Sequence, residues 1–426
     1  MITVPKEFEK YTRRLFGEKL YSTLMEGLQQ EPPVSIRLNP KKVPQPQGLS
    51  ILSSQGTGQP HAVPWCETGF YLPQRPDFTF DPLLHAGCYY VQEASSMFIW
   101  HVLRQHVQTP VTMLDLCAAP GGKSTTALSA LPEGSTLWAN EPVRNRAQIL
   151  HENIQKWGWS PCVVTNCYPR DYARAGMQFD VILCDVPCSG EGMFRKDPNA
   201  MAEWSPQNVE KCWRLQREIV SEAWKCLQDG GLFIYSTCTF NTHENEENIR
   251  WMQEELGATV VPVETRQEWN ITGSLLEGFN EPVYRFIPGV TQGEGLFVCV
   301  MRKNGEARGE KQGTRNKGRD KRSEVQGMEK AEVAEALAVD FNPAKYPMAE
   351  LPYPTAISYL RREAITLPPE TPHGLVIVTF DGHPLGFVKN IGNRANNLYP
   401  KEWRIKSTHI PKNYETIFRH TEQDPH

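Results

Sequence analysis

Residues 111–123 read VTMLDLCAAPGGK, and this stretch decides the fold. A short apolar run ends in a turn with two glycines, and the helix-forming segment STTALSAL follows at once. The pattern repeats downstream, where STLWANE precedes PVRNRAQILHENIQKWG, and FDVILCDVPC and GLFIYSTCT flank VEKCWRLQREIVSEAWKCL. Short apolar runs that alternate with helices are typical of a parallel sheet covered on both faces. The sequence therefore predicts a doubly wound, Rossmann-like α/β domain.

The glycine turn predicts a ligand site, because ligands of doubly wound sheets bind at the carboxyl ends of the strands. Gly121 and Gly122 allow a tight turn and a close approach of the backbone to a ligand. The segment lacks the GxGxxG of dinucleotide sites, and Cys117 stands where a phosphate loop needs its first glycine. Glu141, after the second strand, is placed to accept hydrogen bonds from two ribose hydroxyls. Together these features indicate a nucleoside-containing cofactor, although a plain structural turn and a surface glutamate remain the alternatives.

Two cysteines follow the later strands of the predicted sheet. Asp185 and Cys188 end one strand in DVPCSG, and Cys238 ends another in STCT. Each cysteine alone would be explained as a small buried hydrophobic residue. Because both fall at the ligand-binding edge, we interpret them as a thiol pair beside a carboxyl group. That set fits nucleophilic activation of an unreactive ring carbon.

Composition excludes several classes of protein. The chain has 426 residues, 39% of them hydrophobic and 22% charged, which is typical of an ordinary folded protein with roughly two to four domains. Eleven cysteines without a CxxC pair fit neither a disulfide framework nor a zinc ribbon. No stretch has the apolar length of a membrane span or of a secretory signal, so we expect a cytoplasmic protein with no membrane partner.

The parts outside the α/β pattern differ in composition. An amphipathic helical segment, FEKYTRRLFGEKLYSTLMEGL, and the extended VSIRLNP predict a small α+β module over residues 1–106, before the catalytic domain of residues 107–303. Net charge is −4, yet residues 302–322 hold nine basic and three acidic side chains. We predict a basic flexible linker over 304–330, which is either a solvated spacer or an arm that contacts phosphates. Residues 331–426 form a separate C-terminal piece.

The motifs together resemble one family. DLCAAPGGK, DVPCSGEGMFRKDP and STCT, with YYVQEASSM upstream, closely resemble the RNA cytosine-5 methyltransferases of the Nol1/Nop2/Sun family, from about Pro5 to Arg302. The segment HGLVIVTFDGHPLGFVKNIGNRANNLYPKEWRI resembles the PUA-like RNA-binding module of the bacterial RsmF group, which modifies small-subunit ribosomal RNA. The resemblance implies an S-adenosyl-L-methionine-dependent core between an N-terminal RNA-binding module and a β-rich PUA-like domain. A β-rich domain for protein contact or solubility is the alternative for the tail.

The resemblance also implies a role for each motif residue. Glu141 would hold the ribose, and Arg146 matches a family arginine, although a surface role on its helix is equally open. Asp185 would lie at both the cofactor and the cytosine, where a protonated carboxyl donates to the ring nitrogen. Cys238 would add to carbon 6 of cytosine so that carbon 5 takes the methyl group, and Cys188 would assist removal of the carbon 5 proton. No metal is required. The residues implied to line S-adenosyl-L-methionine are Cys117, Ala118, Ala119, Pro120, Gly121, Gly122 and Lys123.

Some assignments rest on analogy. DNA cytosine-5 methyltransferases use the cysteine of the Pro-Cys pair and the RNA family uses that of the Thr-Cys pair, so we follow the RNA family. Lys196 is a candidate for contact with RNA or for catalysis, and a solvated loop lysine is the alternative. Many family members carry an adenine-contacting aspartate where this chain has Tyr168. Tyr168 could stack on the adenine ring, or Asn166 or Asp171 could supply the hydrogen bond.

The implied substrate is RNA. A thiol cannot reach its target carbon inside a stacked helix, so the cytosine must be single-stranded or flipped out. We expect small-subunit (16S) ribosomal RNA as partner and a monomeric enzyme. A transfer RNA cytosine-5 methyltransferase and a non-catalytic RNA-binding ribosome assembly factor are the alternatives.

Overall fold

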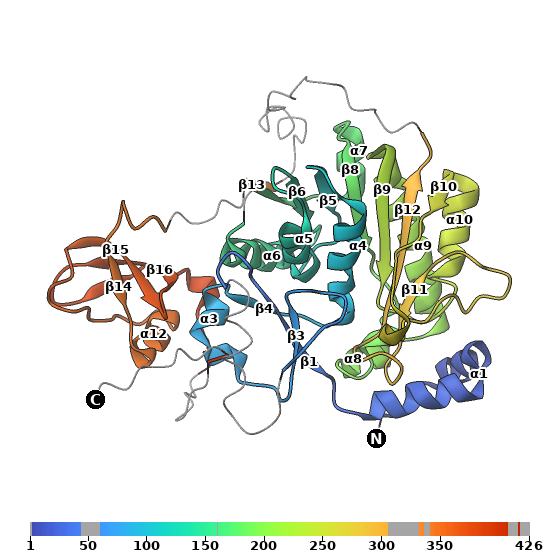
Figure 1. The fold of residues 1–426 in the computed structure, drawn as a ribbon, viewed down its shortest axis with the longest axis horizontal. Coiled ribbons are helices and arrows are strands. Elements are labelled where there is room, and N and C mark those ends of the chain that lie inside the picture. The colour runs from blue at the N-terminus through green and yellow to red at the C-terminus, as the bar shows by residue number, and fades with distance from the viewer. Residues whose placement is uncertain are drawn as a thin grey trace.

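A twisted sheet of mainly parallel strands forms the centre of the molecule (Figure 1). The computed structural model describes residues 2–43, 60–159, 161–305, 332–335, 341–407 and 416–417. Within these ranges the central sheet has nine strands in the order β10-β12-β9-β8-β5-β6-β7-β13, and β11 pairs with β12. The strands are β5 (Thr112–Asp115), β6 (Thr136–Asn140), β7 (Cys162–Asn166), β8 (Phe179–Asp185), β9 (Leu227–Thr237), β10 (Ala258–Val260), β11 (Tyr284–Phe286), β12 (Leu296–Lys303) and β13 (Glu332–Glu335).

Strands β5 to β9 confirm the predicted doubly wound order. The chain starts in the middle of the sheet at β5, proceeds outward through β6 and β7, and then returns to the other side of β5 with β8 and β9. These five strands are parallel. The direction of winding reverses between β5 and β8, so the turn after β5 lies beside the end of β8. This is the switch point at which such sheets bind ligands.

Helices bury both faces of the sheet because apolar side chains point alternately to each side. Met113 and Val181 pack with one group of helices, whereas the neighbouring Leu114 and Ile182 pack with the other. Figure 1 shows the two helical layers on either side of the strands. One layer contains α4 (Phe98–His106), α5 (Gly122–Ala130) and α6 (Arg144–Trp157), and the other contains α7 (Pro169–Arg174), α9 (Pro206–Lys225) and α10 (Glu246–Leu256).

The N-terminal residues form two separate elements. The predicted amphipathic helix is α1 (Lys6–Gln29), which breaks at Gly17, where φ is 70°. Its apolar side, with Phe8 and Leu24, packs on Phe194 and Phe240 of the catalytic domain. The following strands form a small sheet of their own in the order β2-β3-β1-β4. Its elements are β1 (Val34–Leu38), β2 (His61–Ala62), β3 (Gly69–Leu72) and β4 (Tyr89–Val91), with η1 (Phe78–Phe80), α3 (Pro82–His85) and η2 (Ser95–Met97) alongside.

The C-terminal domain is β-rich, as predicted. Its described elements are β14 (Met348–Glu350), α12 (Tyr353–Leu360), β15 (Gly374–Phe380), β16 (His383–Asn390), β17 (Ala395–Asn397) and η5 (Lys401–Trp403). Tyr353 and Tyr359 share a hydrophobic core with Phe80 and Leu83 of the N-terminal module. The Tyr353 hydroxyl also donates to the Phe80 carbonyl oxygen at 3.0 Å. The C-terminal domain, which lies to the left in Figure 1, therefore packs against η1 and α3 of the N-terminal module.

Several features fall outside the predicted plan. Strand β13 belongs to the C-terminal piece by sequence, yet it pairs antiparallel with β7 of the central sheet. Most of the predicted basic linker, residues 306–330, lies outside the described residues. Arg302 and Lys303 end β12 and donate to backbone carbonyls beside it. The remaining short helices are η3 (Glu191–Met193), α8 (Pro198–Glu203) and η4 (Gln267–Trp269).

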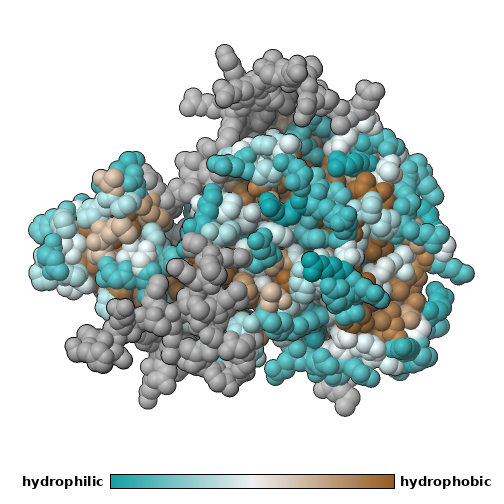
Figure 2. All heavy atoms as spheres, viewed as in Figure 1, coloured by the Kyte–Doolittle hydropathy of each residue, from teal (hydrophilic) through white to brown (hydrophobic). Residues whose placement is uncertain are grey.

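The surface of the molecule is mainly hydrophilic, as expected when the apolar side chains are buried in the cores. Figure 2 shows mainly hydrophilic residues over the described part of the visible face, with hydrophobic residues between them. Among the helices of the described ranges, none combines the length and the apolar character needed to cross a membrane.

Candidate active site

The turn after β5 forms one wall of the site at the switch point. Two backbone hydrogen bonds hold it, from the Leu116 amide to the Leu183 oxygen at 2.9 Å and from the Ala118 amide to the Asn140 oxygen at 2.8 Å. Gly121 has a φ of 116°, in the left-handed region that favours glycine, and α5 begins at the next residue. The turn therefore presents its backbone at the strand ends, as the sequence predicts. A Cβ atom at Gly122 would face Tyr90 and Gln92 of the N-terminal module, so Gly121 is the residue that the turn itself requires.

The N-terminal module holds the helix that follows this turn. Arg37 of β1 is fully buried and donates to Gln92 and to the hydroxyl of Thr125 in the first turns of α5. Its guanidinium also lies over the Trp157 ring, 4.4 Å from the centroid. Burial lowers the pKa of Arg37 to about 10, which leaves it charged at neutral pH. The position of α5 thus depends on the module that precedes the catalytic domain.

Glu141 lies at the end of β6, next to the turn. Its carboxylate accepts a hydrogen bond from the Val143 amide at 2.9 Å and lies 3.3 Å from Arg146 Nη1. Arg146 Nη2 donates to the Ala119 oxygen at 3.0 Å, so Arg146 joins the turn to the buried glutamate. A ribose bound by Glu141 would lie beside Arg146 and Ala119. Arg146 therefore contacts two of the predicted cofactor residues.

The carboxyl groups at this edge outnumber the cations. Asp115, Glu141 and Asp185 all lie close enough to Cys117 to affect its thiol, and burial together with their charges raises the Cys117 pKa. Asp115 is buried, and its Oδ1 atom has no hydrogen-bond partner among the described residues. Burial raises the pKa of Asp115 to about 7. An unpaired buried acceptor beside the turn fits a ligand that carries N–H donors, as S-adenosyl-L-methionine does.

Asp185 joins the cofactor turn to the strand of the second cysteine. Its Oδ2 atom forms an ion pair with Lys123 Nζ at 2.8 Å, and its Oδ1 atom accepts from the Ser236 hydroxyl at 2.6 Å. Burial alone would lower the pKa of Lys123, but Asp185 raises it, and the nearby Cys238 sulfur raises it further. Both oxygens of Asp185 therefore act as acceptors. The sequence did not reveal that Lys123 would turn toward Asp185.

The two predicted cysteines lie next to each other. The distance between Cys188 Sγ and Cys238 Sγ is 3.1 Å, and the Cys238 amide donates to Cys188 Sγ at 3.3 Å. Both side chains are half-buried free thiols. The hydrogen bond to Cys238 and burial raise the pKa of Cys188 well above its usual value, and the charge of Glu244 acts in the same direction. The two sulfur atoms are therefore close enough to exchange a proton.

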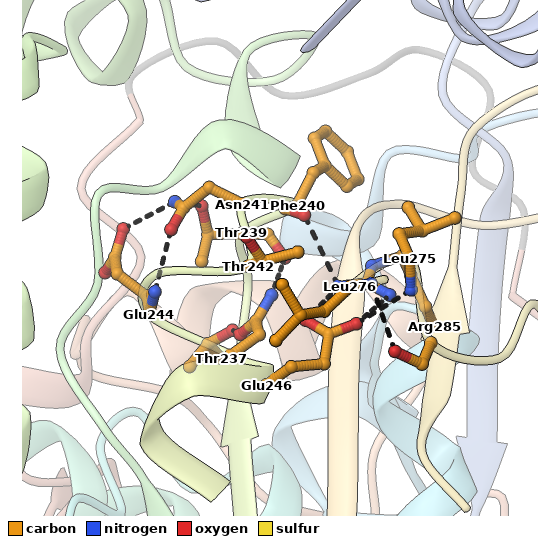
Figure 3. Close-up of polar contacts among 12 residues, drawn as sticks. Thr237, Thr239, Phe240, Asn241, Thr242, Glu244, Glu246, Leu275, Leu276 and Arg285 are labelled. Atoms are coloured by element: carbon orange, nitrogen blue, oxygen red, sulfur yellow. Dashed lines mark hydrogen bonds and ion pairs between the residues drawn. The ribbon is translucent and has the colours of Figure 1, made fainter. Parts of the chain in front are cut away.

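Buried polar groups fix the loops that carry the two thiols. Figure 3 shows Asn241 and Glu244 turned toward each other near Thr237, the last residue of β9. Glu191, from the loop after Cys188, accepts the backbone amides of Phe240 and Asn241. Gly192 lies so close to Gly295 and to the Cys238 carbonyl oxygen that a Cβ atom there would fall within 2.9 Å of both. These contacts hold the Cys188 and Cys238 loops in one arrangement.

The remaining predicted residues divide into structural and exposed ones. The Arg195 side chain is buried and pairs with Glu294, whereas Lys196 is exposed and its Nζ atom lies 3.6 Å from the same carboxylate. Tyr168 is 57% exposed, and the Arg170 guanidinium lies over its ring, 5.2 Å from the centroid. The Asp171 carboxylate accepts the Tyr168 amide, and Asn166 donates to the Glu141 carbonyl oxygen. Asp171 and Asn166 thus already have backbone partners, and an adenine contact would have to share them.

Sequence reasoning missed the supporting residues. Asn140 is buried and bonds to the carbonyl oxygens of Leu116 and Cys167, which joins the ends of three strands. Its position directly before Glu141, at the end of a predicted strand, could have indicated that Asn140 supports the site. Glu191 and Glu244 are also buried, but glutamates in a polar stretch give no such signal.

Three protein-family models match consecutive parts of the chain. The N-terminal domain of 16S rRNA methyltransferase RsmF matches residues 4–94, and 16S rRNA methyltransferase RsmB/F matches residues 102–302. The methyltransferase RsmF PUA domain matches residues 347–405. Together they cover all three parts of the fold.

Similar proteins include several named ribosomal RNA small subunit methyltransferase F. The protein from Cronobacter sakazakii is 30% identical over 434 residues, which cover 86% of this chain and 89% of that protein. The protein from Pectobacterium atrosepticum is 36% identical over 276 residues, 64% of this chain and 56% of that protein. In that comparison, the chain spans about half the length of its relative.

Solved structures share the fold. Pyrococcus horikoshii NSun6, solved with SFG, is 22% identical, with a TM-score of 0.60 over 71% of this chain and 99% of that chain. A methyltransferase homolog protein from Pyrococcus horikoshii is 25% identical, with a TM-score of 0.61 over 71% of this chain and 96% of that chain.

Proposed function

Since the chain belongs to the family of ribosomal RNA small subunit methyltransferase F, we propose that it methylates carbon 5 of cytosine in RNA, with small-subunit (16S) ribosomal RNA as substrate. The contact of 3.1 Å between Cys188 Sγ and Cys238 Sγ carries this proposal. Addition to a pyrimidine ring and later elimination need different proton transfers, and two adjacent thiols can divide that work. A cofactor-binding or assembly role alone would not need such a pair.

The cofactor in this proposal is S-adenosyl-L-methionine, which supplies the methyl group when bound. Residues 117–123 line it, Glu141 holds the ribose, and Arg146 braces the turn through the Ala119 oxygen. The unpaired Oδ1 of Asp115 is a further acceptor at the same edge.

The thiols and Asp185 act on the cytosine. The Cys238 thiolate forms a bond to carbon 6, which raises the electron density at carbon 5. Asp185 meets the edge of the cytosine, where a protonated carboxyl would donate to the ring nitrogen and stabilise the charge that develops on attack. After methyl transfer, the carbon 5 proton leaves to the Cys188 thiolate, the double bond between carbons 5 and 6 forms again, and Cys238 leaves as a thiolate. Bonding of Cys238 to carbon 6 removes its hydrogen bond to Cys188, so the half-buried Cys188 can then release its own proton to water.

RNA would contact the parts around the catalytic domain of residues 107–303. We assign these contacts to the module of residues 1–106, the basic linker of 304–330 and the PUA-like domain of 331–426. The N-terminal module and the C-terminal domain share one hydrophobic core, so they would bind RNA as one rigid surface. The expectation of a cytoplasmic monomer, needing no metal, goes with this proposal.

Bisulfite sequencing tests the proposal. Ribosomal RNA from a strain that lacks this chain should contain an unmethylated cytosine, and the wild-type gene should restore its methylation. Cys238→Ala should not restore it, whereas Cys299→Ala, at a buried cysteine of β12, should. Methylation found only in transfer RNA would instead indicate the transfer RNA enzyme. Unchanged methylation in both RNAs would favour a non-catalytic assembly factor.

A further inference from the structure

A chain of hydrogen bonds links the N-terminal module to the cofactor turn of residues 117–123. Arg37 of β1 is completely buried, and its Nη2 atom donates to the Thr125 hydroxyl at 2.5 Å. This hydroxyl has one proton to donate, and the carbonyl oxygens of Gly121 and Gly122 lie 2.9 Å and 3.0 Å from it. Gly121 is the residue whose φ of 116° shapes the turn. The guanidinium of Arg37 therefore acts on the cofactor turn through a single hydroxyl.

Gln92 forms a second link beside the first. It directly follows β4 and is buried, and its Nε2 atom donates to the Thr126 hydroxyl at 3.1 Å. The Thr126 hydroxyl donates to the carbonyl oxygen of Gly122 at 2.9 Å. Arg37 Nε donates to Gln92 Oε1 at 2.8 Å, so the two links hold each other in place. Two neighbouring hydroxyls of α5 thus connect the turn with the module.

The start of α5 buries hydroxyl groups where apolar side chains would be expected. Ser124, Thr125 and Thr126 are completely buried, although a helix usually turns an apolar stripe toward the core. Ser124 donates to Asp115 Oδ2 at 2.6 Å, whereas the other two hydroxyls meet side chains of the N-terminal module. The N-cap residue, Gly121, offers no side chain to hold this end of the helix. The module therefore supplies contacts that fix the first turns of α5.

Stability of the fold alone does not explain the charge of Arg37. Among the described residues its partners are hydroxyl, amide and carbonyl oxygens and the ring of Trp157, with no carboxylate. Burying a cation without an anion costs free energy, and an apolar side chain can often replace a buried charge without loss of stability. After such a replacement, the Thr125 hydroxyl would keep its carbonyl acceptors and Gln92 would keep Thr126. No buried group would lose its only partner.

We propose that Arg37 is a positioning residue for the cofactor, which acts through the Thr125 hydroxyl to fix the carbonyl of Gly121 and so preorganises residues 117–123 for S-adenosyl-L-methionine. This inference rests on the proposed function for the identity of the cofactor. A site that is already ordered loses less conformational freedom when its ligand binds, so its affinity is higher. The N-terminal module then contributes to cofactor binding as well as to RNA binding.

Titration calorimetry with S-adenosyl-L-methionine tests this inference. Arg37→Met should bind the cofactor about threefold to thirtyfold more weakly than the wild type, the range typical of residues that act on a site indirectly. Its affinity for a 16S ribosomal RNA transcript should not change, because the completely buried Arg37 cannot contact RNA. Arg75→Met is the matched control and should bind the cofactor as the wild type does. Arg75 is an exposed cation of the same module and lies over the Phe78 ring.

Variants of Thr125 test the path, and hydrogen exchange tests the turn without cofactor. Thr125→Val should also weaken cofactor binding, whereas Thr125→Ser keeps the hydroxyl and should bind as the wild type does. Arg37→Met/Thr125→Val should bind no more weakly than Thr125→Val, because Arg37 acts through the hydroxyl. The Thr125 amide donates to the Gly121 oxygen at 2.9 Å. Amides of residues 121–126 should therefore exchange faster in Arg37→Met than in the wild type.

Three results would overturn the inference. They are equal cofactor affinities in Arg37→Met and the wild type, additive losses in the double variant, and a parallel fall of cofactor and RNA affinity in Arg37→Met, which would indicate a purely structural role. The same proteins distinguish the inference from the proposed function. If the expected losses appear but no protein methylates cytosine, the proposed function fails and the role of Arg37 stands. If the wild type methylates cytosine and Arg37→Met binds the cofactor equally well, the inference fails alone.

Discussion

Replacing Arg285 by Met should strongly destabilise the catalytic domain. Arg285 and Glu246 are both completely buried and form two hydrogen bonds of 2.8 Å, as Figure 3 shows beside Phe240. Arg285 also donates to the carbonyl oxygens of Gly273 and Phe240. Arg285→Met leaves Glu246 with a buried charge whose only remaining partner in this cluster is the Leu275 amide. Removing one partner of a buried ion pair costs about 3 to 5 kcal/mol.

Urea unfolding followed by tryptophan fluorescence measures this cost. With a urea slope of about 3 kcal/mol per molar, the midpoint of the catalytic domain should fall by about 1 M or more. The matched control is Arg266→Met, which removes an exposed pair with Glu268 and should cost less than about 1 kcal/mol. The double variant Arg285→Met/Glu246→Gln should regain part of the loss. A midpoint for Arg285→Met equal to that of Arg266→Met would refute the reasoning.

Three further predictions concern the cofactor, pH and RNA. Glu141→Ala should weaken binding of S-adenosyl-L-methionine more than tenfold in calorimetry, about 1.4 kcal/mol, and an unchanged affinity would remove Glu141 from the site. Because burial raises the pKa of Asp115 to about 7, above its value in the unfolded chain, the stability that it contributes is complete below about pH 4 and is lost as pH rises through 7. Urea midpoints at pH 5 and pH 8 should therefore differ less in Asp115→Asn than in the wild type, and equal differences would contradict this. Neutralising the basic residues of the linker between 308 and 322 should weaken RNA binding and flatten its salt dependence at unchanged cofactor affinity, whereas equal salt slopes would support a plain spacer.

The parallel core was predictable because its physical signal is local. Strands such as Phe179–Asp185 are apolar on both faces, and the turn after each strand is short and distinctive. The motifs within these turns also indicated the family, and the comparisons confirm it. The meeting of Asp185 with residues 117–123 follows from the strand order alone.

The packing between distant segments was not predictable in the same way. The Tyr353 hydroxyl donates to the carbonyl oxygen of Phe80, which is 273 residues away in the sequence. No local sequence pattern indicates such a contact. Strand β12 enters the sheet antiparallel beside β9 for the same reason, since its apolar run fits either direction. The docking of the C-terminal domain on the N-terminal module is therefore a result of the structure.

The candidate site was likewise predictable only where the signal in the sequence is local. Sequence placed Cys188 and Cys238 at one edge, but their separation depends on Glu191 and Glu244, whose burial no sequence pattern indicates. The ion pair of 2.8 Å between Lys123 and Asp185 was not predicted either, because Lys123 was assigned only to the cofactor turn. Charged residues that lie far apart in the chain meet only in the fold.

The most direct test of the account is a denaturing gel of cysteine variants with substrate RNA and S-adenosyl-L-methionine. Cys188→Ala can attack and methylate but should eliminate slowly, so it should give a slow-migrating protein–RNA band. Cys238→Ala cannot bond to carbon 6 and should give none, and Cys212→Ala, at a half-buried thiol of α9, should behave as the wild type does. A band with Cys238→Ala and none with Cys188→Ala would make Cys188 the nucleophile. No band with either variant, with methylation intact, would contradict covalent catalysis by this pair.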